Sequence, residues 1–215
     1  MSDSLALLSV NVGLPRPIGT LHDEPVISGI GKKPVVAAAV TVGSTNIEGD
    51  GQANLSVHGG ADKAVYAYSA ENWSWWEKEQ SLPCEPATFG ENLTLGRAFE
   101  SRIAIGDRFR WGEALLEVSQ PRAPCFKLAM HTRREDVPQL MIGSARCGWY
   151  LRVIEEGRAP TTSELVQVFR SSGPTVQDAF VAAFQPRTRD FCLRVHDAPA
   201  LAEAWRRAVA RRIGA

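Results

Sequence analysis

A cysteine flanked by basic residues is the strongest candidate for chemistry in this sequence. Cys125 follows an expected strand and precedes an expected helix, with Arg122 and Lys127 close by in the chain. Cations and a helix N-terminus favour the thiolate form, and Pro121 and Pro124 restrict the backbone that presents it. A thiolate can act as a nucleophile, carry a persulfide or bind a soft metal. A small buried hydrophobic role is the structural alternative, and we weigh the two equally on these residues alone.

A glycine-rich segment, residues 49–63, is the second candidate. Gly59 and Gly60 can bring backbone N–H groups close to an anion, and Lys63 adds a positive charge, so a phosphate can be held here. The spacing matches neither G-x-G-x-x-G nor the phosphate-loop pattern. A structural loop is therefore the favoured interpretation, and His58 by itself is a weak signal.

A third cluster lies at the start of an expected strand, where Glu91 and Asn92 follow Gly90. An acid and an amide in this place can orient a ring-shaped ligand by hydrogen bonds. An asparagine that only closes a turn is the more ordinary alternative, and it is favoured here.

Short apolar and β-branched runs between Gly and Pro residues predict a mainly β fold up to about residue 120, either a barrel or a sandwich. A short helix over 69–80 interrupts the strands, with Ser69 as its cap. A helical stretch over 125–142 follows them. The expected strands cover residues 5–12, 34–43, 65–69, 108–111, 114–120, 148–154 and 164–169, and those at 108–111 and 114–120 form a hairpin.

The tail from residue 169 is expected to be helical and basic. Thr175 and Asp178 have the spacing of a capping box at a helix start. Residues 200–213 have one apolar face and an opposite face with four arginines, Arg206, Arg207, Arg211 and Arg212. The tail contains eight arginines and four acids, so the zero net charge of the chain combines an acidic part, 1–168, with a basic part, 169–215.

Composition excludes several classes of protein. With 215 residues, 44% of them hydrophobic and 22% charged, the chain is long enough for a core and is neither disordered nor fibrous. The longest apolar run has six residues, 35–40, too few to span a bilayer, and no secretion signal is expected. The four cysteines form no C-x-x-C pair, which argues against a zinc site or a disulfide scaffold. We therefore expect a cytoplasmic protein with free thiols.

Four motifs in a fixed order resemble the MOSC-domain family, named after the C-terminal domain of molybdenum cofactor sulfurase. They are G-D-x-Q leading into residues 57–65, the strand 89–93, the hairpin 106–114 and the segment 119–128 around Cys125. The last motif is similar to the YiiM-like branch, whose members carry a C-terminal three-helix extension. The resemblance implies a MOSC-type β-barrel over 1–168 with a few helices, and a small three-helix domain over 169–215.

The resemblance also implies a molybdenum pterin cofactor. The functional cysteine of the family falls on Cys125, which would bind molybdenum. The residues expected to bind the pterin and its phosphate are His58, Gly59, Gly60, Lys63, Arg122 and Lys127, with Asn92 at the pterin edge and Asp62 orienting Lys63 or His58. Asn54 stands where many relatives carry an acid.

Similar proteins reduce N-hydroxylated bases, such as N-hydroxylaminopurines, to amines. The leading interpretation is therefore a molybdenum-dependent oxidoreductase, with His58 as the proton donor because an ordinary histidine titrates at about pH 6.5. Nothing in the sequence resembles a flavin or iron–sulfur module, so an external flavin-containing reductase is the expected electron donor.

Two alternatives stay open. Cys125 in the same setting fits a sulfur carrier that works through a persulfide. The arginine face of the tail fits a nucleic-acid-binding module, although it lacks base-reading Asn or Gln residues and such faces are usually solvated. The tail also fits a docking surface for the electron donor or for the second subunit of a homodimer.

Overall fold

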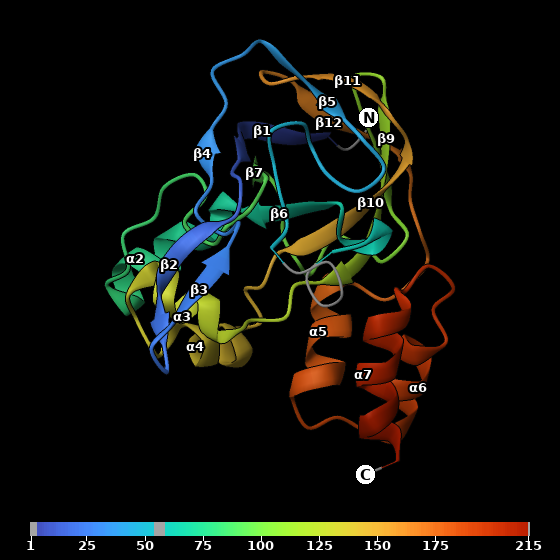
Figure 1. The fold of residues 1–215 in the computed structure, drawn as a ribbon. Coiled ribbons are helices and arrows are strands. Elements are labelled where there is room, and N and C mark those ends of the chain that lie inside the picture. Colours follow the sequence, from blue (N-terminus) through green and yellow to red (C-terminus); the bar gives the residue numbers. More distant parts are fainter. Residues whose placement is uncertain (1–3, 54–58, 215) are drawn as a thin grey trace.

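Within the described residues, 4–53 and 59–214, seven strands of the computed structural model close into a barrel (Figure 1). Their order is β12-β8-β9-β10-β6-β7-β1, and β1 returns to pair with β12. The strands are β1 (Ser4–Val12), β6 (Val65–Ser69), β7 (Leu93–Gly96), β8 (Arg108–Trp111), β9 (Ala114–Pro121), β10 (Trp149–Glu155) and β12 (Glu164–Phe169). The mainly β barrel expected from the sequence is confirmed.

The barrel wall follows from the periodicity and the turns of the sequence. β8 and β9 form the expected hairpin, and Gly112 at its turn has φ +58°, a left-handed conformation that favours glycine. β6 and β7 run parallel, so a crossover must join them. That connection contains a 3₁₀ turn, Ala70–Asn72, and α2 (Trp73–Gln80). Trp76 of α2 is fully buried and donates to the Tyr68 hydroxyl at 2.6 Å.

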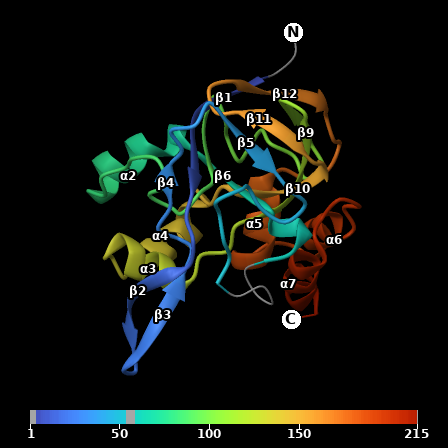
Figure 2. The same ribbon diagram turned by 45° about the horizontal axis from the view of Figure 1, so that its top comes forward.

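Shorter strands outside the barrel differ from the sequence prediction. The single strand expected over 34–43 is two, β4 (Lys33–Pro34) and β5 (Ala39–Val42), and β5 pairs with β11 (Gly157–Pro160). A hairpin of β2 (Arg16–Leu21) and β3 (Glu24–Ser28) was not predicted. It extends away from the barrel (Figure 2) and is mostly exposed. Because it is exposed, its sequence lacks the apolar alternation that predicts a half-buried strand.

The helical segments agree with the predictions. α3 (Phe126–Thr132) and α4 (Val137–Ser144) follow β9, and the tail forms α5 (Val176–Phe184), α6 (Arg189–His196) and α7 (Glu203–Ile213). Thr175 and Asp178 make the expected capping box. No helix among the described residues is long and apolar enough to cross a membrane.

The tail packs against one end of the barrel, where Figures 1 and 2 both place α5 and α7. Trp205 of α7 donates to the Ala179 carbonyl of α5 at 2.9 Å. Two bonds join the tail to barrel strands: Ala202 N–H donates to the Ser119 carbonyl at 2.9 Å, and Arg152 donates to the Ala200 carbonyl at 3.0 Å. The segment just before α7 is therefore bonded to β9 and β10 of the barrel.

Candidate functional site

A half-open pocket lies where the β3–β4 connection, the loop after β5 and the chain after β9 meet. Four residues that the sequence singled out line it: Lys63, Asn92, Arg122 and Cys125, and Lys127 joins them at the rim. The other lining residues are Ser28, Gly29, Ile30, Lys32, Asp50, Gly51, Gln52, Ala53, Tyr66, Phe89, Gly90 and Tyr150. The pocket combines a thiol, several cations and two tyrosines.

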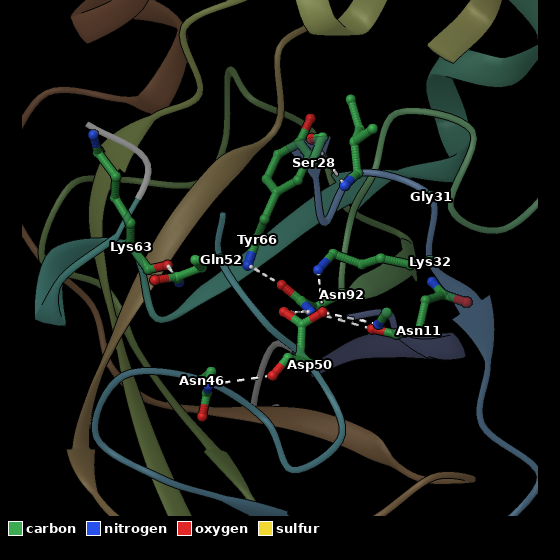
Figure 3. Close-up of polar contacts among 12 residues, drawn as sticks. Asn11, Ser28, Gly31, Lys32, Asn46, Asp50, Gln52, Lys63, Tyr66 and Asn92 are labelled. Atoms are coloured by element: carbon green, nitrogen blue, oxygen red, sulfur yellow. Dashed lines mark hydrogen bonds and ion pairs between the residues drawn. The ribbon is translucent and has the colours of Figure 1, made fainter. Parts of the chain in front are cut away.

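A buried ion pair forms one wall of the pocket (Figure 3). Lys32 pairs with Asp50, and their side chains are 8% and 2% exposed. Burial lowers the pKa of Lys32, and the Asp50 carboxylate opposes that shift. Asp50 also accepts hydrogen bonds from the Gly13 N–H at 3.0 Å and from the Asn92 amide at 2.9 Å. Its charge is thus matched by donors inside the protein and is not free for a ligand.

Asn92 connects this ion pair to the barrel. Its side-chain oxygen accepts the Tyr66 N–H at 3.0 Å, and its side-chain nitrogen donates to the Asn11 carbonyl at 3.1 Å as well as to Asp50. The amide therefore bridges β6 and β1 just before β7 begins, as Figure 3 shows. Both amide hydrogens are used within the protein, and one oxygen lone pair is left, so the role of Asn92 at a pterin edge stays a prediction.

Arg122 lies deep in the pocket without an acidic partner. It is 5% exposed, its guanidinium lies 5.6 Å from the centre of the Tyr66 ring, and it donates a weak bond to Met141 Sδ at 3.6 Å. Among the described residues, no carboxylate forms an ion pair with it. Burial lowers the pKa of Arg122, but the nearby Tyr66 and Cys125 groups raise it to a net increase. A buried cation without a carboxylate partner is costly, so an anion beside it would be stabilising.

The thiol lies beside this cation. Cys125 is partly exposed and has extended backbone angles, φ −141° and ψ 168°, just before α3 begins. Lys127, two residues on, donates to the Ile27 carbonyl of β3 at 2.8 Å and so closes the rim of the pocket. Two other cysteines have different surroundings: burial raises the pKa of Cys84 to about 12, and burial also raises the pKa of Cys147 well above its usual range. Neither of these two lines the pocket.

The glycine-rich segment is only partly joined to the site. Lys63 lines the pocket, and burial lowers its pKa against the field of Asp62. Gly59, Gly60 and Asp62 are not among the lining residues, and the Asp62 carboxylate accepts from Arg152 at 2.8 Å. Asp62 therefore influences Lys63 through its charge.

Two positions lie outside the described residues, His58 and Asn54. The proton-donor role of His58 and the departure from many relatives at Asn54 therefore stay predictions from the sequence.

Sequence reasoning missed Lys32, Tyr66 and Tyr150 as pocket residues. Lys32 lies in the connection after β3, where the sequence predicted no element. Tyr66 and Tyr150 lie in β6 and β10, whose sequences predicted barrel strands and gave no sign of a ligand site. Asp50 could have been predicted as a site residue, since the G-D-x-Q motif contains it, but its ion-pair partner Lys32 lies 18 residues earlier in the chain. No local pattern signals such a pair.

A family model for the MOSC domain matches residues 54–168, more than half of the chain. The chain belongs to the MOSC-domain family. Cys125, Asn92 and Lys63 all lie within the matched residues, while the C-terminal helices and the Lys32 turn lie outside them.

Relatives of this MOSC protein support the YiiM-like branch. It is 41% identical to protein YiiM of Escherichia coli (strain K12) over 171 residues, which cover 77% of this chain and 76% of YiiM. The crystal structure of YiiM from Geobacillus stearothermophilus superposes with a TM-score of 0.81 at 31% identity, covering 97% of this chain and 99% of that one. A protein named reductase from Gibberella moniliformis (strain M3125 / FGSC 7600) is 36% identical over 120 residues, 53% of this chain and 21% of that protein.

Proposed function

We propose that this MOSC protein is a molybdenum-cofactor-dependent reductase that converts N-hydroxylated substrates, of the N-hydroxylaminopurine type, to amines. The observation that carries the proposal is the buried Arg122 guanidinium, which has no carboxylate partner among the described residues and lies beside the Cys125 thiol. A soft ligand next to an uncompensated cation suits a metal held in an anionic organic group. The relative named reductase agrees with this class of reaction.

The residues of the pocket fit a molybdenum pterin. Cys125 would bind the metal as a thiolate, because sulfur is a soft ligand. Arg122, Lys127 and Lys63 would bind the anionic groups of the pterin and its phosphate, with backbone donors from Gly59 and Gly60 at the edge. The buried ion pair of Lys32 and Asp50 would form one wall of the site. The donor set thus supplies one metal ligand and several cations.

The reaction needs two electrons and two protons for each N–O bond that breaks, and it yields an amine and water. When bound, the cofactor would supply the two electrons and an acceptor for the oxygen. This chain supplies binding, orientation and protons: Arg122 keeps its positive charge because burial lowers its pKa by less than the neighbouring Tyr66 and Cys125 groups raise it. Tyr66 and Tyr150 exclude water from the inner wall. His58 is the proposed proton donor, and an external flavin-containing reductase is the proposed source of electrons.

Molybdenum content and activity of Cys125→Ser test the proposal. The full chain is purified from a host that makes the cofactor, and 6-N-hydroxylaminopurine reduction is measured with a flavin-containing electron donor. We expect the variant to lose both bound molybdenum and activity, while Cys84→Ser, the matched control outside the pocket, keeps both. A Cys125→Ser protein that retains its full molybdenum content would refute the role of Cys125 as a molybdenum ligand.

Mass spectrometry on the same preparation separates the sulfur-carrier alternative. A persulfide on Cys125 in protein without metal would favour that alternative, and metal without persulfide favours the reductase.

A further inference from the structure

A second cleft of about 480 Å³ separates the barrel from α5 and α7. It lies on the far side of Lys63, whose side chain lines both this cleft and the central pocket. The volume falls in the range of small-molecule sites, roughly 300–1,000 Å³. The cleft is therefore a candidate extension of the pocket, built by the tail together with the barrel.

One buried polar atom in this cleft has no partner. Gln120, at the end of β9, is 3% exposed, and its side-chain nitrogen donates to the Pro121 carbonyl at 3.3 Å. The side-chain oxygen is buried and accepts no hydrogen bond in the structure. A buried acceptor without a donor is costly, and Gln120 lines the cleft. A ligand with an N–H or O–H group would satisfy it.

The rest of the cleft combines an aromatic wall with positive charge. Phe184 of α5 and Trp205 of α7 meet edge to face, with ring centres 5.9 Å apart. The exposed Arg211 and Arg212 line the cleft together with the partly buried Lys63.

The arginines of α7 fall into two groups. Arg206 and Arg207 pair with Glu203 on the same helix, whereas none of the ion pairs among residues 4–53 and 59–214 involves Arg211 or Arg212. Among the described residues, the two arginines of α7 without an acidic partner, Arg211 and Arg212, are therefore the ones that line the cleft.

We infer that this cleft binds a phosphate ester whose organic part is flat and carries a hydrogen-bond donor. The phosphate would lie between Arg211, Arg212 and Lys63, since cations at a cleft opening attract phosphate oxygens. The flat part would pack against Phe184 and Trp205, and its donor would reach the Gln120 oxygen. The site needs no metal, so it goes beyond the proposed reductase, although its link to catalysis rests on that proposal.

Titration calorimetry with adenosine 5′-monophosphate tests the inference, because this molecule has a phosphate, a flat ring and an amino donor. The full chain is purified from cells that make no molybdopterin. We expect saturable binding that is tighter than that of adenosine or inorganic phosphate alone. An absence of saturable binding overturns the inference and leaves the molybdenum measurements on Cys125 untouched.

Variants locate the binding. Arg211→Gln and Arg212→Gln should each weaken binding about fivefold, the size of a partly exposed ion pair, while the matched control on the same helix, Arg207→Gln, should change it less than about twofold. Gln120→Met should weaken adenosine monophosphate about fivefold through one lost hydrogen bond and leave inorganic phosphate unchanged. Equal weakening by Arg207→Gln would show a non-specific charge effect and would overturn the site.

Loading with the cofactor distinguishes the two sources of such a phosphate. If adenosine monophosphate still binds to cofactor-loaded protein, the cleft takes a phosphorylated substrate. If the loaded protein no longer binds it, the cleft takes the phosphate of the cofactor itself. Both results support a phosphate-ester site.

Discussion

Replacing Asn92 by alanine tests whether this residue holds the site together. The change removes three bonds of a residue that is 3% exposed: those to the Tyr66 N–H, the Asn11 carbonyl and the Asp50 carboxylate. Each buried group left without a partner costs about 1–3 kcal/mol. Water from the adjoining pocket can reach Asp50 and recover part of this. We therefore expect Asn92→Ala to lower the free energy of unfolding by about 3 kcal/mol.

Urea denaturation measures this loss. With a denaturant slope of about 2.5 kcal/mol per molar, the midpoint should fall by about 1.2 M. The control is Asn46→Ala, because Asn46 is half-buried and the one bond of its side chain within the described part of the chain is a long one, 3.4 Å to the Asp50 carbonyl. This control should cost less than about 1 kcal/mol. A loss below about 1 kcal/mol for Asn92→Ala would refute the bridging role and would favour direct ligand contact.

Two further predictions concern buried charges. Burial raises the pKa of Glu100 above its ordinary 4.5, although hydrogen bonds from its neighbours oppose the shift. The contribution of Glu100 to stability should therefore decline as pH rises from about 4.5 through the raised pKa, and Glu100→Gln should make the decline of stability shallower in urea titrations between pH 4.5 and 8. An equal pH slope in both proteins would contradict it. Arg152 donates to Glu117 at 2.9 Å and to the Ala200 carbonyl at 3.0 Å. Arg152→Met should therefore lower the free energy of unfolding by about 2–3 kcal/mol and speed hydrogen exchange in α5–α7. The control Arg110→Met, at an exposed ion pair, should lower it by less than about 1 kcal/mol. Unchanged exchange in the tail would argue against this link.

The predictions from sequence succeeded where the signal is local. Ser69 accepts a hydrogen bond from the Glu71 N–H at the start of the turn before α2, and the Thr175 capping box forms as its spacing requires. Both depend on residues within one helical turn. The β2–β3 hairpin was missed because it is largely exposed and contains Pro17 and Pro25, which weaken a strand signal.

The candidate site likewise combines residues that a local sequence pattern indicated with residues that no local pattern indicated. Cys125, Arg122 and Lys127 are neighbours in the chain, so their charge and softness were visible as a pattern. The sequence around Lys32 and Asp50 shows no such pattern. Each is an ordinary charged residue in the sequence, and the two charges require each other only because the fold buries them.

By itself, the sequence determined the family, the mainly β fold and the helical tail, and it singled out Cys125 as the thiol flanked by cations. These follow from local periodicity, from turn residues and from four motifs in a fixed order. Only the tertiary structure decided that, among the described residues, Arg122 is buried without an acid, Asn92 is used to join strands, and the buried side-chain oxygen of Gln120 accepts no hydrogen bond. The physical reason is that a hydrogen bond or an ion pair depends on which distant residues meet, and burial sets its energy only after the barrel closes.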